Sequence, residues 1–100
     1  MTGSSALDGL TLAARVTPSH SVVFQQLEQE AVLLNLDSGM YFGLDPVGTR
    51  IWNLLAEGQS LLQIVSTIIA EYEVDHEQCK SDLLKLLGDL EAQGLVTVVR

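Results

Sequence analysis

The side chains most able to act as nucleophiles or metal ligands in this chain are its single cysteine, Cys79, and its two histidines, His20 and His76. A lone cysteine cannot close a disulfide within the chain, and one thiol with two distant imidazoles lacks the spacing of a zinc site. A reactive thiolate needs positive surroundings, whereas only Lys80 lies near Cys79 in the sequence. We therefore expect Cys79 to pack as a small apolar side chain and both histidines to lie on the surface.

The motifs of the common enzyme classes are missing from the sequence. It has no glycine-rich phosphate loop before a helix, no serine nucleophile elbow and no pair of histidines on one helical face. Most of its acidic residues are explained as helix caps or solvated surface charge. We predict that the protein is not an enzyme and that it holds no metal and no cofactor.

The composition describes a chain that folds but does not favour nucleic acid. Hydrophobic residues make up 47% of it and charged residues 18%, which is too apolar for a disordered segment. The formal net charge of −8, from thirteen acidic and five basic residues, opposes binding to phosphates. The N-terminus lacks the basic and apolar regions of a secretory signal, and no run of about 18 apolar residues could span a bilayer. We expect a soluble, cytoplasmic protein.

Three strands are predicted in the first half of the chain. Residues 21–27 contain the β-branched and aromatic residues typical of a strand, and residues 31–37 alternate apolar and polar positions. A turn at residues 37–39 uses a glycine with positive φ and leads into a third strand over residues 40–44. This order predicts a three-stranded antiparallel meander.

Three helices follow, each with a capping residue at its start. Asp45 before Pro46 opens a helix that ends near Gly58, and Ser60 with Gln63 forms the capping box of a second helix that ends near Tyr72. Asp75 repeats the cap before a third helix, which Gly94 ends. Residues 95–99 could add a short final strand.

Three strands followed by three helices match a winged helix-turn-helix core with a sheet at its front, and this order predicts an α+β fold. We expect residues 1–17 to form a flexible N-terminal arm and residues 18–100 to form the domain. One hypothesis is therefore that the protein is a winged-helix regulatory module that binds DNA or a protein partner. However, a groove-binding third helix should be basic, and here Lys80 and Lys85 are outnumbered by acidic residues.

The third strand and the third helix could together form a peptide-binding groove. At about 100° per residue, one stripe of the helix holds the core residues Cys79, Leu83, Leu86 and Leu90. Lys80, Leu84 and Leu87 lie on its flank, about 80° to 140° from Cys79, where a broad core face is the alternative explanation. The uncharged run at residues 40–44, if it lies at a sheet edge, could pair with an incoming strand.

The sequence resembles the PqqD-like family, named after pyrroloquinoline-quinone biosynthesis protein D. The resemblance covers about residues 20–98 and includes Leu-Asn-Leu before a Ser-Gly turn, the strand Tyr-Phe-Gly-Leu, and Val-Gly-x-x-Ile-Trp in the first helix. The last helix carries Asp82, Leu86, Leu87 and Leu90 before Gly94-Leu95-Val96. No single piece is specific, but their order and spacing together are.

The resemblance implies a non-catalytic adaptor with a winged-helix-like fold. Members of the family bind the leader segment of a ribosomally made precursor peptide as an extra strand and present it to a maturation enzyme, such as a leader peptidase or a radical enzyme. The Tyr-Phe-Gly-Leu strand is closest to freestanding members that serve lasso-peptide biosynthesis. Carried over by position, the peptide contacts are Met40, Tyr41, Phe42, Gly43, Leu44, Lys80, Leu83, Leu84 and Leu87.

The net acidity departs from what such a role suggests, because leader peptides are often acidic too. Recognition would then depend on backbone pairing and apolar pockets, with Lys80 and Lys85 as the local attractive charges. We expect binding to depend little on salt concentration.

Overall fold

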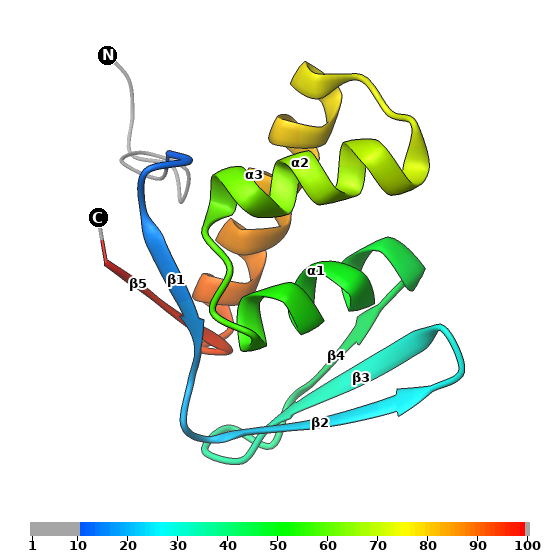
Figure 1. The fold of residues 1–100 in the computed structure, drawn as a ribbon. Helices are drawn as coiled ribbons and strands as arrows, with labels where there is room; N and C mark the ends of the chain where they lie inside the picture. Colours follow the sequence, from blue (N-terminus) through cyan, green and yellow to red (C-terminus); the bar gives the residue numbers. More distant parts are fainter. Residues whose placement is uncertain (1–10, 100) are drawn as a thin grey trace.

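The computed structural model describes residues 11–99, which form five strands and three helices (Figure 1). In chain order these are β1 (Arg15–Pro18), β2 (Val22–Leu27), β3 (Glu30–Asn35), β4 (Tyr41–Leu44), α1 (Pro46–Ala56), α2 (Leu61–Tyr72), α3 (His76–Ala92) and β5 (Val96–Val99). The prediction of an α+β fold, with three strands followed by three helices, is confirmed. The possible strand at the C-terminus is also present.

The three central strands form one antiparallel sheet in the order β2-β3-β4. Two tight turns fix its register, because Glu28 (φ 58°) and Gly39 (φ 76°) adopt the left-handed conformation that such turns require. β3 ends at Asn35, two residues earlier than predicted. The Asn35 side chain accepts hydrogen bonds from the backbone N–H groups of Asp37 and Ser38, at 2.9 and 3.2 Å, and so turns the chain toward β4.

The two faces of this sheet differ in burial. Alternate residues of β3 point inward, and Ala31, Leu33 and Asn35 are all buried. The opposite face carries Val32 and Leu36, which are exposed. α1 covers the inner face, as Figure 1 shows, and the ring of Trp52 stacks on Phe24 of β2 with 6.3 Å between the ring centroids.

Side chains predicted as caps begin all three helices. Asp45 Oδ1 accepts a 2.7 Å hydrogen bond from the Gly48 N–H, and Asp75 Oδ2 accepts one from the Gln78 N–H at 3.1 Å. Ser60 and Gln63 form the predicted capping box. Gly48 leaves room for the first cap, since a Cβ there would lie 3.1 Å from Asp45 Oδ1. The caps thus fix where each helix begins.

A bidentate ion pair joins α1 to α2. The Arg50 guanidinium lies 2.8 Å from Glu71 Oε2, and this hydrogen-bonded contact lowers the pKa of the Glu71 carboxyl. Each side chain of the pair is about one-third exposed, so water weakens the attraction between the two charges. Its consequence here is that Arg50 is not free to neutralise other acidic groups.

The start of the described chain differs from the prediction of an arm over residues 1–17. Residues 15–18 form β1, which pairs antiparallel with β5 from Arg15 opposite Val99 to Pro18 opposite Val96. Ala14 and Val16 are buried in the same core as the helices. Apolar residues in this segment are buried because β5 pairs beside them and α1 packs against them. The first ten residues of the predicted arm lie outside the described part of the chain.

Among the described residues, nineteen buried hydrophobic side chains form one core. All three helices, four of the strands and nearby loop positions contribute to it. Leu33, Leu55, Ile64, Leu83, Leu87 and Leu90 are among those with almost no exposed surface. Within residues 11–99, no helix is both long and apolar enough to cross a membrane.

Candidate functional site

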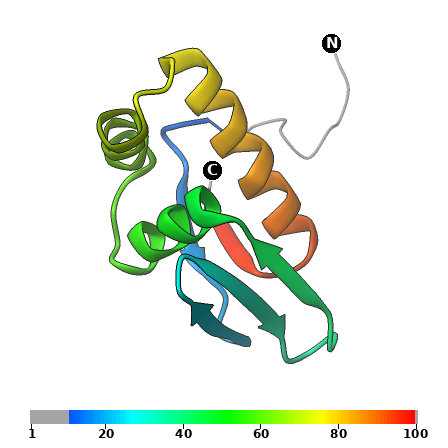
Figure 2. The same ribbon diagram turned by 90° about the vertical axis from the view of Figure 1, so that its right-hand side faces the viewer.

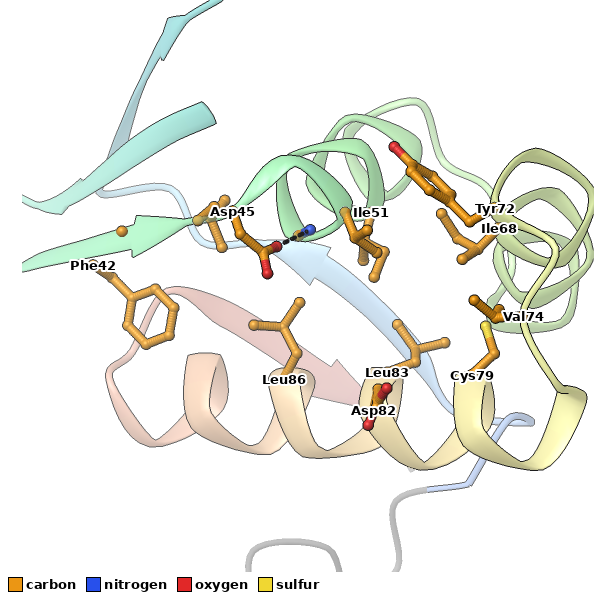
Figure 3. Close-up of a pocket in the computed structure, with 14 residues that line it drawn as sticks. Phe42, Asp45, Ile51, Ile68, Tyr72, Val74, Cys79, Asp82, Leu83 and Leu86 are labelled. Atoms are coloured by element: carbon orange, nitrogen blue, oxygen red, sulfur yellow. Dashed lines mark hydrogen bonds between the residues drawn. The ribbon is translucent and has the colours of Figure 1, made fainter. Parts of the chain in front are cut away.

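A groove of about 510 Å³ lies between β4 and α3, with α1 and α2 behind it (Figure 3). Seen from the side in Figure 2, β4 runs along the edge of the sheet that is nearest to α3. The lining residues are Phe42, Gly43, Leu44, Asp45, Val47, Gly48, Ile51, Ile68, Tyr72, Val74, Cys79, Asp82, Leu83 and Leu86. Most of them are apolar, so the groove suits an apolar ligand group.

β4 is an edge strand with one free side. It pairs with β3 and has no partner on its other side within residues 11–99. The Asn35 N–H donates to the Met40 carbonyl at 3.0 Å, whereas the Leu36 N–H donates to Ser21 on the other side of β3. Since hydrogen-bonding direction alternates along a strand, Met40, Phe42 and Leu44 direct their backbone groups toward β3. Tyr41 and Gly43 therefore present their N–H and C=O groups to the open edge.

The side chains of β4 divide between two environments. Phe42 and Leu44 point inward, and Phe42 is half-buried at the mouth of the groove, where Figure 3 shows its ring directed toward α3. Tyr41 and Met40 lie outside the groove, with 70% and 57% of their surfaces exposed. Gly43 has no side chain, and a Cβ built there would meet no atom within 4 Å. Nothing on Gly43 blocks the approach of another strand.

The α3 wall of the groove differs from the flank predicted from sequence. Leu83 lines the groove as expected, but Lys80, Leu84 and Leu87 do not, and Leu87 has no exposed surface. Asp82 and the half-buried Leu86 take their place. The difference arises because α3 turns Leu83, Leu87 and Leu90 into the core that it shares with α2 and β5. Leu86, predicted in the core stripe, is thereby rotated to the groove.

The floor of the groove comes from helices that the sequence did not connect with the site. Ile51 of α1, Ile68 and Tyr72 of α2, and Val74 in the following loop all line it. The sequence predicts Ile51 and Ile68 only as apolar positions of the first two helices. Their shared location depends on how α1 and α2 pack, and no local signal in the chain reports that.

Cys79 forms part of this floor and behaves as predicted, as a small apolar side chain. It is buried with 6% of its surface exposed, and burial raises the pKa of its thiol, with a further contribution from the Asp82 carboxylate. A thiol of raised pKa carries little thiolate at neutral pH. Across residues 11–99 no three His, Cys, Asp or Glu side chains gather in a way that could hold a metal ion.

The fold and the groove can be compared with known proteins. The family model for coenzyme PQQ synthesis protein D (PqqD) matches residues 30–96, about two-thirds of the chain. The chain belongs to the PqqD family. The matched part of this PqqD-family chain runs from the start of β3 to the start of β5 and so contains every residue that lines the groove.

Two solved structures are similar to this PqqD-family chain. TbiB1, in complex with the TbiA(beta) leader peptide, has 45% sequence identity and a TM-score of 0.77, over 80% of this chain and 93% of that one. Lasso peptide synthetase B1, complexed with the leader peptide, has 24% identity and a TM-score of 0.76, over 83% and 98%. The second likeness is one of fold. No curated protein sequence matches the chain.

Proposed function

We propose that this protein is a non-catalytic adaptor that binds the leader segment of a ribosomally made precursor peptide and delivers it to a maturation enzyme. The observation that carries the proposal is the open edge of β4, where Tyr41 and Gly43 direct backbone groups outward beside an apolar groove. The 45% identical TbiB1, solved with a leader peptide, supports it. The setting we propose is lasso-peptide biosynthesis in the cytoplasm.

Backbone pairing supplies the first part of the binding mechanism. A peptide that lies alongside β4 in extended form can donate to and accept from Tyr41 and Gly43, extending the sheet to a fourth strand. These hydrogen bonds are independent of the peptide's side chains, so they orient it without selecting its sequence. Met40, Tyr41, Phe42, Gly43 and Leu44 are the proposed strand contacts.

Side-chain burial supplies the second part. Alternate residues of an extended peptide point in the same direction, and those that face α3 can enter the groove between Phe42 and Leu86. Burying one leucine-sized side chain contributes roughly 1.5 to 3 kcal/mol. Leu83 and Leu86 are the proposed apolar contacts on α3. Of the positions predicted from sequence, Lys80, Leu84 and Leu87 lie off this path.

The proposed role needs no bond-making by the protein itself. The thiol on the groove floor has a raised pKa, which disfavours the thiolate needed for nucleophilic chemistry. An adaptor acts instead by raising the concentration of the precursor close to an enzyme. We propose a leader peptidase as that enzyme, with another modifying enzyme as the alternative. We propose that the binding domain, predicted from sequence as residues 18–100, also includes the whole of β1, because Val16 is buried in its core.

Leu86→Glu provides the test of this function. Placing a charge in the apolar groove should weaken binding of the fluorescein-labelled TbiA(beta) leader peptide by at least about tenfold, measured by fluorescence anisotropy. Leu62→Glu is the matched control, because Leu62 is 59% exposed on α2 and lies outside the groove. Circular dichroism checks that both variants fold. If folded Leu86→Glu and Leu62→Glu bind the peptide equally well, the groove is not the binding site.

A further inference from the structure

The charged residues that line the groove are both acidic, Asp45 on one wall and Asp82 on the other. We propose that these carboxylates select a peptide with a lysine or arginine next to its apolar anchor, and that they reject an acidic residue there. This inference rests on the proposed function and names the class of peptide that the groove accepts. The site itself is the groove and the open strand edge, and the carboxylates decide its specificity.

Asp45 can cap α1 and contact a ligand at once. Its Oδ1 is used by the Gly48 N–H, while Oδ2 takes no hydrogen bond from residues 11–99. Figure 3 shows the carboxylate at the junction of β4 and α1, directed toward α3. The residue is exposed, so a peptide that leaves the end of β4 would pass beside it.

Asp82 contributes the second carboxylate from α3. Its Oδ1 accepts a 2.9 Å hydrogen bond from Gln78 Nε2, which holds the side chain on this face of the helix, and Oδ2 has no partner among the described residues. Leu86, one turn further along α3, lies in the groove beside it (Figure 3). An apolar contact and a negative charge therefore lie one helical turn apart.

Within residues 11–99, neither of these carboxylates has an ion-pair partner. Arg50 is paired with Glu71 at 2.8 Å, and Lys85 lies 3.8 Å from Asp89. Neither they nor Lys80 line the groove. The formal net charge of −8 adds a general repulsion toward acidic peptides.

A lysine or arginine side chain has the chemistry that this arrangement accepts. Its aliphatic stem can lie along the apolar wall near Leu86 while its charged end reaches an aspartate oxygen at the rim. An arginine could bind one carboxylate with two parallel hydrogen bonds. A glutamate at the same position would meet two like charges and lose its hydration. Affinity should therefore fall as salt concentration rises, in contrast to the weak salt dependence expected from sequence.

The test begins with a displayed library of short random peptides selected against the wild-type protein. Basic residues should be enriched next to the apolar anchor, and acidic residues depleted there. The Asp45→Asn, Asp82→Asn double variant should lose this enrichment. Asparagine preserves the cap at position 45 and the acceptor for Gln78, so the fold is kept. The control, Asp37→Asn with Glu57→Gln, raises the net charge by the same two units outside the groove and should retain the enrichment.

One enriched peptide is then synthesised with lysine, glutamine or glutamate at the selected position and titrated by fluorescence anisotropy. We expect glutamine to weaken binding about two- to fivefold, as for exposed charge pairs, and glutamate to weaken it further. Peptides enriched without any charge preference, or a preference that survives in the double aspartate variant, would overturn the charge selection alone. A failure to enrich any peptide would contradict the adaptor function itself.

Discussion

Asn35 is the polar residue on which the position of β4 depends. It is buried, and its Nδ2 donates a 2.8 Å hydrogen bond to the Gln93 carbonyl at the end of α3. Its Oδ1 accepts the two N–H groups of the turn before β4. Gly94 fits against it with φ 71°, and a Cβ there would lie 3.1 Å from Asn35 Nδ2. One side chain thus ties the edge strand to the helix across the groove.

Replacing Asn35 with alanine should therefore destabilise the protein by roughly 1 to 3 kcal/mol, because three backbone groups lose a partner. Urea unfolding followed by circular dichroism measures the change. Asn53→Ala is the matched control, since the Asn53 side chain makes one hydrogen bond within residues 11–99, a 3.4 Å contact with Gln26 at the surface. Its loss should shift stability by about 0.5 kcal/mol or less. Equal stability of the two variants would mean that Asn35 does not hold the turn.

Leu86 and Leu87 show that a shift of one residue along α3 decides whether a side chain is buried or lines the groove. They are neighbours in the sequence and have the same side chain, yet Leu87 is fully buried and Leu86 lines the groove. A rotation of 100° per residue separates a core position from a position that lines the groove. This is why three of the four positions predicted on α3 do not line the groove.

At the scale of elements, the proposed binding of a peptide depends on the open edge of β4. Its backbone groups alternate between β3 and the open side, so its residues do not contribute equally. Proline in place of Phe42 would remove a backbone N–H that is directed toward β3. Proline in place of Gly43 would remove a backbone N–H that faces the open edge. Proline is tolerated on edge strands when its missing N–H faces solvent.

Gly43→Pro should therefore weaken peptide binding and preserve the fold. We expect affinity for the labelled TbiA(beta) leader peptide to be at least about tenfold below that of Gly43→Ala, which keeps the N–H. The alanine side chain has room, since nothing lies within 4 Å of its Cβ. Anisotropy titration and thermal unfolding give affinity and stability separately. Strand addition on β4 would be contradicted by equal affinities of the proline and alanine variants.

At the scale of the whole molecule, the two ends of the described chain stabilise each other. β1 pairs with β5, the Ser19 N–H donates to the Leu95 carbonyl at 3.0 Å, and Val16 enters the core with 6% of its surface exposed. The match to the PqqD family model begins only at residue 30. β1 and β2 therefore precede the matched segment, and β1 pairs with β5 and packs against α1.

A chain that starts at residue 19 should lose roughly 2 to 4 kcal/mol of stability, because Val16 and Ala14 no longer cover the core and β5 loses its partner. A chain that starts at residue 11 keeps all of these contacts and should unfold at nearly the same urea concentration as the full chain. Where the shorter variant remains folded, it should still bind the leader peptide. Unfolding of both truncated chains at the same midpoint would show that β1 is not a structural strand.

The sequence by itself determined the local structure of this protein. Strand alternation, the caps at Asp45, Ser60 and Asp75, and the turn at Gly39 all depend on residues close together in the chain, so the elements and the α+β fold were predictable. The third strand as half of a candidate site followed from its uncharged, proline-free composition. The same local information is enough to place the chain in its family.

The tertiary structure alone decided which surfaces meet. Pairing of β1 with β5 joins the two ends of the described chain, and the groove floor joins Ile51, Ile68 and Val74 from separate elements. The face of α3 that lines the groove is fixed by its packing against α2 and β5, which turned Leu87 inward and left Leu86 and Asp82 beside β4. Helical periodicity gives the angles between residues but not the direction of the core, and that direction depends on contacts distant in sequence.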